Sequence, residues 1–350
     1  MMTITQAIEA IRPLNELAMQ ASKRHWDSIA KPLNSLGLLE KAVIQIAGIT
    51  GNPQCDIKKR GLVIMCADNG VVDEGVTQTG REVTAIVAKN FTLGCTSVCK
   101  MAQVAGVDLF PVDIGMCTDV EGVPNRKVAY GTKNIAVSPA MTRQQAVETI
   151  EVGIDMVYQL KRQGYKILAT GEMGIGNTTT SSAIASVLLG QDVDAVTGRG
   201  AGLSDSGLCK KREAINRAIA FNQPNSLDAL DVLSKVGGFD IAGLTGVFLG
   251  GAALHVPILV DGFISAVAAL LAVRLAPLAG GYILASHRSE EPAGQMVLNS
   301  LGKQPFLTAA MCLGEGTGAV AALPILDMAF AVYDSMSTFD DIKIEAYQPL

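Results

Sequence analysis

A single glutamate stands between glycines in a segment that could carry acid–base chemistry. The segment reads Leu313-Gly314-Glu315-Gly316-Thr317-Gly318 and follows the apolar pair Met311-Cys312. A carboxylate held in a water-poor pocket can take a proton from an acceptor as that acceptor attacks. The alternative is a glutamate that accepts backbone N–H bonds within its own loop. The segment alone favours neither interpretation.

A glycine-rich loop in the middle of the chain predicts a phosphate-binding site. It reads Gly171-Glu172-Met173-Gly174-Ile175-Gly176-Asn177-Thr178-Thr179-Thr180, and a helix of small residues is predicted from Ser181 to Leu189. Glycines allow backbone N–H groups to crowd an anion, and the N-terminus of a helix adds a favourable partial charge. A tight structural turn is the alternative interpretation.

The same loop disfavours two other nucleotide chemistries. Asn177 stands where a P-loop has its lysine, which argues against hydrolysis of a nucleoside triphosphate. Thr179 stands where the dinucleotide fingerprint has its third glycine, which argues against an NAD-dependent enzyme.

Two more polar segments are candidates for ligand contacts. Gly198-Arg199-Gly200-Ala201-Gly202-Leu203 precedes Lys210-Lys211-Arg212 by a few residues, so one lysine could close the phosphate site. The alternative is a turn followed by the solvated start of a basic helix.

An H-x-x-E spacing occurs in the segment Ser286-His287-Arg288-Ser289-Glu290-Glu291, but no second histidine is placed to complete a metal site. A substrate-contacting loop or a structural turn is predicted there.

Composition excludes several classes of protein. The net charge is −5, and no basic stripe interleaved with aromatic residues points to nucleic acid. The start of the chain carries Glu9 and Glu16 and does not resemble a signal peptide, so a cytoplasmic location is expected. Seven cysteines form an odd set without a framework spacing, which predicts reduced, buried thiols and no metal site. The uncharged run Ile241 to Val260 is interrupted by Pro257, and we interpret it as buried α/β structure rather than a membrane span.

Alternating strands and helices must position these segments. Thr142 and Gln145 form a predicted capping box, apolar residues follow at helical spacing, and Gly164 ends that helix. Strand and helix alternation favours an α/β fold, a Rossmann-like and mainly parallel sheet with helices on both faces. In such folds ligands gather at the carboxyl ends of the strands. The predicted strands are Leu62 to Cys66, Val107 to Ile114, Lys166 to Ala169, Pro257 to Val260 and Gly281 to Ala285.

Taken together, the segments resemble one family over nearly the whole chain. It is the family of nicotinate mononucleotide:dimethylbenzimidazole phosphoribosyltransferases, which activate the lower-ligand base of cobamides. The loops at Gly171 and Leu313 and the pair Ser286-His287 belong to the resemblance. The remaining marks are Lys31-Pro32-Leu33-Asn34-Ser35-Leu36-Gly37, Ala67-Asp68-Asn69-Gly70-Val71, Glu74-Gly75-Val76, Lys235-Val236-Gly237-Gly238-Phe239-Asp240 and Leu259-Val260-Asp261-Gly262-Phe263.

The resemblance implies an activity and an organisation. It implies transfer of the 5-phosphoribosyl group of nicotinate mononucleotide to an aromatic base, without a cofactor, giving an α-linked riboside phosphate. It also implies a single unit over residues 1–350, with a large α/β domain over about 31–324 and a small helical part from about 1–30 and 325–350. A homodimer, or a heterodimer with a homologous subunit, is expected. A non-catalytic nucleotide-binding subunit of such a pair is the alternative.

The resemblance also implies roles for individual residues. Glu315 matches the family's general base, and Glu172 matches a second carboxylate in the site. The residues implied in binding of the phosphate or nucleotide are Gly174, Ile175, Gly176, Asn177, Thr178, Gly200, Ala201, Lys211 and Ser289. The implied acceptor pocket comprises Thr79, Gly80, Val83, Val87 and Leu313.

The chain departs from the family pattern near the acceptor. Asn69 stands where a histidine is common, Gly80 replaces the usual proline, and Val87 stands where a family member has a glutamine that binds a benzimidazole nitrogen. Valine removes that hydrogen bond and makes the pocket more apolar. One branch of the family acts on phenol and p-cresol and works as a pair of unlike subunits. Val87 makes this branch a candidate, with Glu315 marking the catalytic member.

Overall fold

A computed structural model describes residues 2–347 of the chain, and this part contains a five-stranded sheet. The strands lie in the order β2-β1-β3-β4-β5, and every neighbouring pair is parallel. All five strands predicted from the sequence are present, so the α/β prediction is confirmed. The strands are β1 (Arg60–Ala67), β2 (Val107–Gly115), β3 (Ile167–Met173), β4 (Ile258–Val260) and β5 (Ile283–Ala285).

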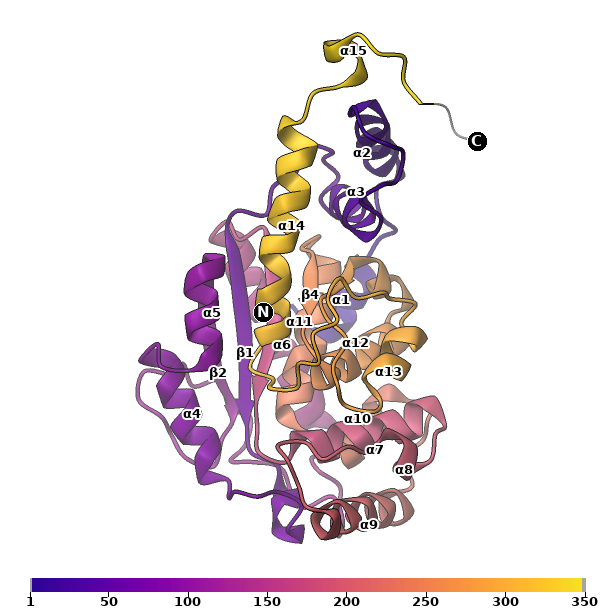
Figure 1. Cartoon of the computed structure of the whole chain (residues 1–350). Helices are drawn as coiled ribbons and strands as arrows, with labels where there is room; N and C mark the ends of the chain where they lie inside the picture. Colours follow the sequence, from indigo (N-terminus) through magenta and orange to yellow (C-terminus); the bar gives the residue numbers. More distant parts are fainter. Residues whose placement is uncertain (1, 348–350) are drawn as a thin grey trace.

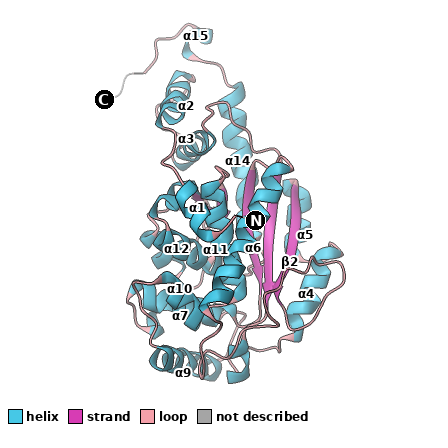
Figure 2. Ribbon diagram, turned by 180° about the vertical axis from the view of Figure 1, so that it is seen from behind, coloured by secondary structure: helices cyan, strands magenta, loops and turns pink. Residues whose placement is uncertain are grey.

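Helices cover both faces of the sheet because the strands are apolar on both sides. Successive side chains of a strand point to opposite faces. In β1, Val63 and Met65 pack into one hydrophobic core, whereas Leu62 and Ile64 pack into a second core on the other face. Figure 1 shows α14 and α5 on the second face, and Figure 2, seen from behind, shows α6 and α11 on the first. This double burial explains the near-continuous apolar runs in the sequence.

The helices connect the strands and extend the chain at both ends. The α-helices are α1 (Ile4–Ala10), α2 (Glu16–Ser28), α3 (Leu38–Thr50), α4 (Glu82–Thr92), α5 (Ser97–Ala105), α6 (Arg143–Arg162), α7 (Asn177–Leu189), α8 (Val193–Val196), α9 (Asp205–Asn222), α10 (Ala229–Val236), α11 (Phe239–Ala253), α12 (Phe263–Leu275), α13 (Gly294–Ser300), α14 (Thr317–Ser335) and α15 (Phe339–Ile342). Two 3₁₀ helices, η1 (Gly70–Glu74) and η2 (Pro277–Tyr282), complete them.

Local signals in the sequence set several of these bounds. The predicted capping box opens α6, because the Thr142 side chain accepts from the Gln145 N–H and the Gln145 side chain accepts from the Thr142 N–H. Gly164 follows the end of α6 with a φ of +90°. The small-residue helix predicted from Ser181 begins earlier, at Asn177, so the last four residues of the predicted glycine-rich loop form its first turn.

Helices α2 and α3 lie with the C-terminal end of α14 and with α15 at one end of the molecule, whereas α1 packs against α11 and α6 in its middle (Figure 1). In α2, the rings of His25 and Trp26 lie 4.4 Å and 5.0 Å from the ring of Tyr333 in α14. Pro324 lies inside α14, which runs without a break from the Glu315 loop to this end. The division into a large domain over 31–324 and a helical part over 1–30 and 325–350 stays a prediction.

The apolar run from Ile241 to Val260 forms α11 and β4, and every residue of α11 is buried in the core. Within residues 2–347, α14 is long and apolar enough to cross a membrane, but 56% of it is buried in this fold.

The prediction of buried thiols was wrong for part of the set. Cys55, Cys66 and Cys99 are buried, whereas Cys95, Cys117, Cys209 and Cys312 are exposed because they lie on loops and on the outer sides of helices.

Candidate active site

A pocket of about 340 Å³ lies at the carboxyl ends of the strands. The chain leads from β1 to β2 on one side of the sheet, and from β3 to β4 on the other side. The direction in which strands are added therefore reverses between the neighbouring strands β1 and β3. Such a switch point is the usual place for a ligand in an open parallel sheet. Glu172 and Met173 at the end of β3, Asp261 after β4 and His287 after β5 all line the pocket.

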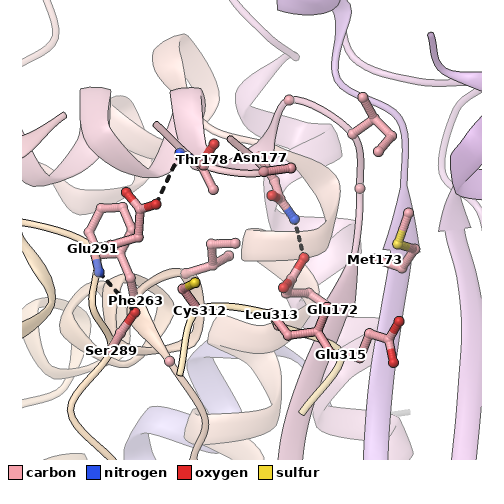
Figure 3. Close-up of a pocket in the computed structure, with 18 of the residues that line it drawn as sticks. Glu172, Met173, Asn177, Thr178, Phe263, Ser289, Glu291, Cys312, Leu313 and Glu315 are labelled. Atoms are coloured by element: carbon pink, nitrogen blue, oxygen red, sulfur yellow. Dashed lines mark hydrogen bonds between the residues drawn. The ribbon is translucent and has the colours of Figure 1, made fainter. Parts of the chain in front are cut away.

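The pocket brings most of the predicted site residues together. Lys211, Gly80 and Val83 do not line it. Those that do are Glu172, Gly174, Ile175, Gly176, Asn177, Thr178, Gly200, Ala201, Ser289, Thr79, Val87, Leu313 and Glu315. In Figure 3, Ser289 and Glu291 lie on one side of the pocket, and Glu172, Glu315 and Met173 lie on the other.

Glu172 belongs to a buried network of carboxyl groups. The Asn177 Nδ2 group donates to Glu172 Oε2 and, at 3.0 Å, to Asp240 Oδ2. Burial, and next the nearby Asp240 carboxylate, together raise the pKa of Glu172 to about 8. Burial also raises the pKa of Asp240 to about 6. Glu172 is therefore protonated at neutral pH, since its charged form would be both desolvated and repelled by Asp240.

The loop that carries Glu315 has an unusual backbone. Gly314, Glu315 and Gly316 have φ angles of +89°, +61° and +94° in succession. Glycine adopts this region freely, but glutamate does so at a cost of about 1 kcal/mol or more. The Glu315 Oε2 atom accepts from the Val98 N–H in the first turn of α5, at 3.2 Å. The glutamate thus has a backbone partner in another element, where the alternative interpretation placed it in its own loop.

Close backbone contacts hold this loop against β3. A Cβ atom at Gly171 would lie 2.5 Å from the carbonyl oxygen of Glu315, and one at Gly314 would lie 2.5 Å from Glu172 Oε1. Asp261 fixes the other side of the loop by accepting from the Gly316 N–H at 3.2 Å and the Ala319 N–H at 3.0 Å. The two pocket glutamates therefore lie on contacting segments, although they are far apart in the sequence.

The predicted phosphate site is built in two layers. The N-terminus of α7 and the loop at Gly200 face the pocket. Lys211 lies behind them, fully buried, and its Nζ donates to Thr178 Oγ1 at 2.8 Å and to the Gly198 carbonyl at 3.1 Å. Burial lowers the pKa of Lys211 to about 8. In this arrangement Lys211 supports the two loops from below and contributes positive charge without lining the pocket.

Two of the predicted phosphate-binding amides have other partners in this structure. The Ile175 N–H donates to Thr84 Oγ1 at 3.1 Å, and the Gly200 N–H donates to Glu291 Oε1 at 3.0 Å. Ser289 Oγ accepts from the Glu291 N–H at 3.3 Å, which fixes the turn between them (Figure 3).

Several residues in or next to the pocket had no role assigned from the sequence. Asp240 and Asp261 lay within family segments, but no local signal showed that they meet Asn177 and the Glu315 loop. His287 is 5% exposed, and neither ring nitrogen has a hydrogen-bond partner in the described part of the chain. Burial lowers the pKa of this histidine, which keeps the ring neutral. Its ring packs against Gly318, where a side chain would collide with it.

Apolar side chains form the wall next to Glu315. Val87 lies in α4 and is joined in the pocket lining by Val76, Met173 and Leu313, with Thr79 at the edge. Such a wall suits a flat aromatic ring, and the few polar groups around it can fix the orientation of that ring. The predicted acceptor side of the pocket thus lies beside the predicted base.

The fold and the site define an α/β protein with a pocket at the switch point of a parallel sheet, where buried carboxyl groups lie beside a glycine-rich loop. A family model described as phosphoribosyltransferase matches residues 11–344. A nicotinate-nucleotide–dimethylbenzimidazole phosphoribosyltransferase of Ruminiclostridium cellulolyticum is 50% identical over the whole of both chains, and one of Clostridium acetobutylicum is 47% identical over the same extent. The crystal structure of CobT from Thermus thermophilus superimposes with a TM-score of 0.89 at 34% identity, covering 95% of this chain and all of the other.

These comparisons establish the family. The chain belongs to the nicotinate-nucleotide–dimethylbenzimidazole phosphoribosyltransferase family. The resemblance predicted from the ordered segments is confirmed, and with it the class of enzyme, a phosphoribosyltransferase.

Proposed function

We propose that the protein transfers the 5-phosphoribosyl group of nicotinate mononucleotide to an aromatic base of the kind used as a cobamide lower ligand. The bond between C1′ and the nicotinate nitrogen breaks, and the acceptor forms its bond to C1′ from the opposite face. Nicotinate leaves with the electron pair of the broken bond, and the product is an α-linked riboside phosphate. The names of the relatives support this donor and a benzimidazole acceptor.

The observation that carries the proposal is the position of Glu315. Its carboxylate lies in a pocket that also holds the glycine-rich loop, and its backbone rests on Gly171 of that same segment. One structural unit therefore carries both the proposed donor loop and the proposed base. Glu315 takes the proton that the acceptor loses on attack. Glu172, protonated and bound to Asn177, positions the substrate beside it.

The phosphate requires backbone N–H groups and a positive charge but no metal ion. The N-terminus of α7 offers N–H groups and a favourable partial charge, and Lys211 supplies the cation behind the loop. This division explains why Asn177 can replace the lysine of a P-loop. In this site the Asn177 side chain serves the carboxyl network.

We further propose that the acceptor range includes phenols. A neutral benzimidazole has one ring N–H and one unprotonated ring nitrogen, and thus two polar in-plane atoms that need partners, whereas a phenol offers one hydroxyl group, from which Glu315 can accept. Burying a ring nitrogen without a partner costs about 1–3 kcal/mol. Because Val87 provides no hydrogen bond, we expect phenol or p-cresol to be used at least as well as dimethylbenzimidazole.

The test is turnover of purified protein with nicotinate mononucleotide and a panel of benzimidazoles and phenols, with release of nicotinate followed by chromatography. Glu315→Gln keeps the size of the side chain and removes its basicity, so turnover should fall by about 10²- to 10⁴-fold. Glu121→Gln, an exposed glutamate far from the pocket, is the matched control. Near-normal turnover of Glu315→Gln would refute the assignment of the base.

The number of subunits in the enzyme needs a separate measurement. We propose that the chain works in the cytoplasm as a dimer, either with a second copy or with a homologous subunit. Sedimentation of the purified chain measures the first arrangement directly. Binding of the nucleotide without turnover of any acceptor would instead indicate a non-catalytic subunit.

A further inference from the structure

Glu291 makes a contact that the transfer reaction does not explain. Its Oε1 atom accepts from the Gly200 N–H at 3.0 Å, and Gly200 lies in the loop that the proposed function assigns to the phosphate (Figure 3). Its Oε2 atom is buried against Gly198 and has no hydrogen-bond partner among residues 2–347. A side-chain carboxylate thus occupies part of a site built for an anion.

The surroundings of this carboxylate are those expected of a phosphate oxygen. Gly200 has a φ of +53°, and a Cβ atom there would lie 2.8 Å from Thr178 Oγ1 and 3.5 Å from Lys211 Nζ. The Gly200 backbone therefore lies directly over the buried lysine, whose charge Glu291 also feels. Charged acceptors form the stronger hydrogen bonds to backbone N–H groups, so both a carboxylate and a phosphate suit this position.

One N–H group cannot serve both anions fully. A phosphate that used the Gly200 N–H would meet the Glu291 carboxylate at the same point, and two negative charges at contact distance repel each other strongly in a partly buried site. The carboxylate has room to leave, because Glu290 and Pro292 on either side of it are exposed and the segment forms a surface loop.

We propose that the donor phosphate displaces Glu291 from the Gly200 N–H, so that Glu291 sets the affinity for the phosphorylated donor. This inference rests on the proposed phosphate site. Without substrate, Glu291 keeps the loop at Gly198–Gly200 in its bound shape. With substrate, the phosphate takes over the N–H group and the carboxylate turns toward solvent. The affinity for the donor is thereby lowered, and in return the loop at Gly198–Gly200 is already formed before the donor binds.

The experiment measures binding of inorganic phosphate by isothermal titration calorimetry, without any acceptor. Glu291→Ala removes the competing carboxylate, and Glu291→Gln keeps its shape but weakens it as an acceptor. We expect phosphate to bind about 10-fold more tightly to the alanine variant than to the wild type, with the glutamine variant between them. Glu290→Gln, the exposed neighbour, should change affinity by less than about twofold, because a solvent-exposed charge is screened. Nicotinate mononucleotide should displace the bound phosphate.

The outcomes separate this inference from the proposed function. Unchanged or weaker phosphate binding in both Glu291 variants would overturn the inference and show that Glu291 is a fixed support of the loop. Turnover of nicotinate mononucleotide in the wild type would leave the proposed function standing in that case. Conversely, tighter phosphate binding in the variants without turnover of any acceptor would support displacement and refute the transfer reaction.

Discussion

Replacing Glu172 by glutamine should make the protein more stable at neutral and alkaline pH. Glutamine keeps the shape of the side chain and its oxygen can still accept from Asn177 Nδ2, as Glu172 Oε2 does. The change removes the one group in the network that burial holds most strongly in its protonated form. It should also lower turnover, because the glutamate lies in the active-site pocket.

The size and sign of the effect come from the pKa of Glu172. Burial raises this pKa from 4.5 to about 8 in the folded chain. A carboxyl group shifted in this direction contributes stability that is complete below pH 4.5 and is lost as the pH rises through 8. Each pH unit in this interval is worth about 1.4 kcal/mol, so the whole interval amounts to about 5 kcal/mol. At pH 7 glutamine should therefore stabilise the fold by about 3 kcal/mol, since only the unfolded wild-type chain gains from ionisation.

The assay is urea denaturation followed by circular dichroism at pH 5, 7 and 9, for the wild type, Glu172→Gln and the exposed control Glu121→Gln. The advantage of the glutamine variant should be small at pH 5, about 3 kcal/mol at pH 7 and largest at pH 9. The control should follow the wild type throughout. A glutamine variant that is equally or less stable than the wild type at pH 7 and 9 would show that Glu172 is ionised in the fold, and the reasoning from burial would fail.

Three further changes test other parts of the site. Val87→Gln should shift preference from phenols toward dimethylbenzimidazole by about 5- to 150-fold in kcat/KM, and a wild type that ignores phenols would contradict this. Lys211→Ala should weaken binding of nicotinate mononucleotide by about 1.5–3 kcal/mol in calorimetry, because the charge and the hydrogen bond to Thr178 are both lost; unchanged affinity would exclude the lysine from the phosphate site. Gly171→Ala should push away the carbonyl oxygen of Glu315, which lies 2.5 Å from the added carbon, and lower turnover by about 10²-fold; full activity would mean that the loop tolerates the shift.

Local patterns in the sequence were enough to predict the sheet. Each strand is a short apolar run that ends in glycine or small polar residues, and a parallel sheet buried on both faces requires such runs. The capping box at Thr142 and Gln145 depends on residues three positions apart, so it could be read directly. The pocket at the strand ends then followed from the general behaviour of parallel sheets.

Contacts between distant segments could not be read in this way. Asn177 meets Asp240 across 63 positions, and Gly200 meets Glu291 across 91. No sequence spacing predicts either contact, because the fold alone determines which loops lie at the same edge of the sheet. The family resemblance implied a role for Lys211 at the phosphate, but neither it nor the spacing showed that the side chain lies behind the loop. That position depends on how closely α9 packs against α7, which is a property of the folded core.

The proposed acceptor wall comes largely from a different part of the chain than the proposed donor-binding groups. Val76, Thr79 and Val87 lie between β1 and β2, whereas both glutamates and the proposed phosphate loops lie at the end of β3 or later in the chain. The two parts touch, because Thr84 Oγ1 accepts from the Ile175 N–H and Gln78 Nε2 donates to the Ala201 carbonyl. Substitutions at Val76 and Val87, which make neither of these contacts, are therefore the ones expected to change acceptor choice while the supports of the donor loops remain. An architecture of this kind allows a lineage to follow a change in the available aromatic bases without rebuilding its catalyst.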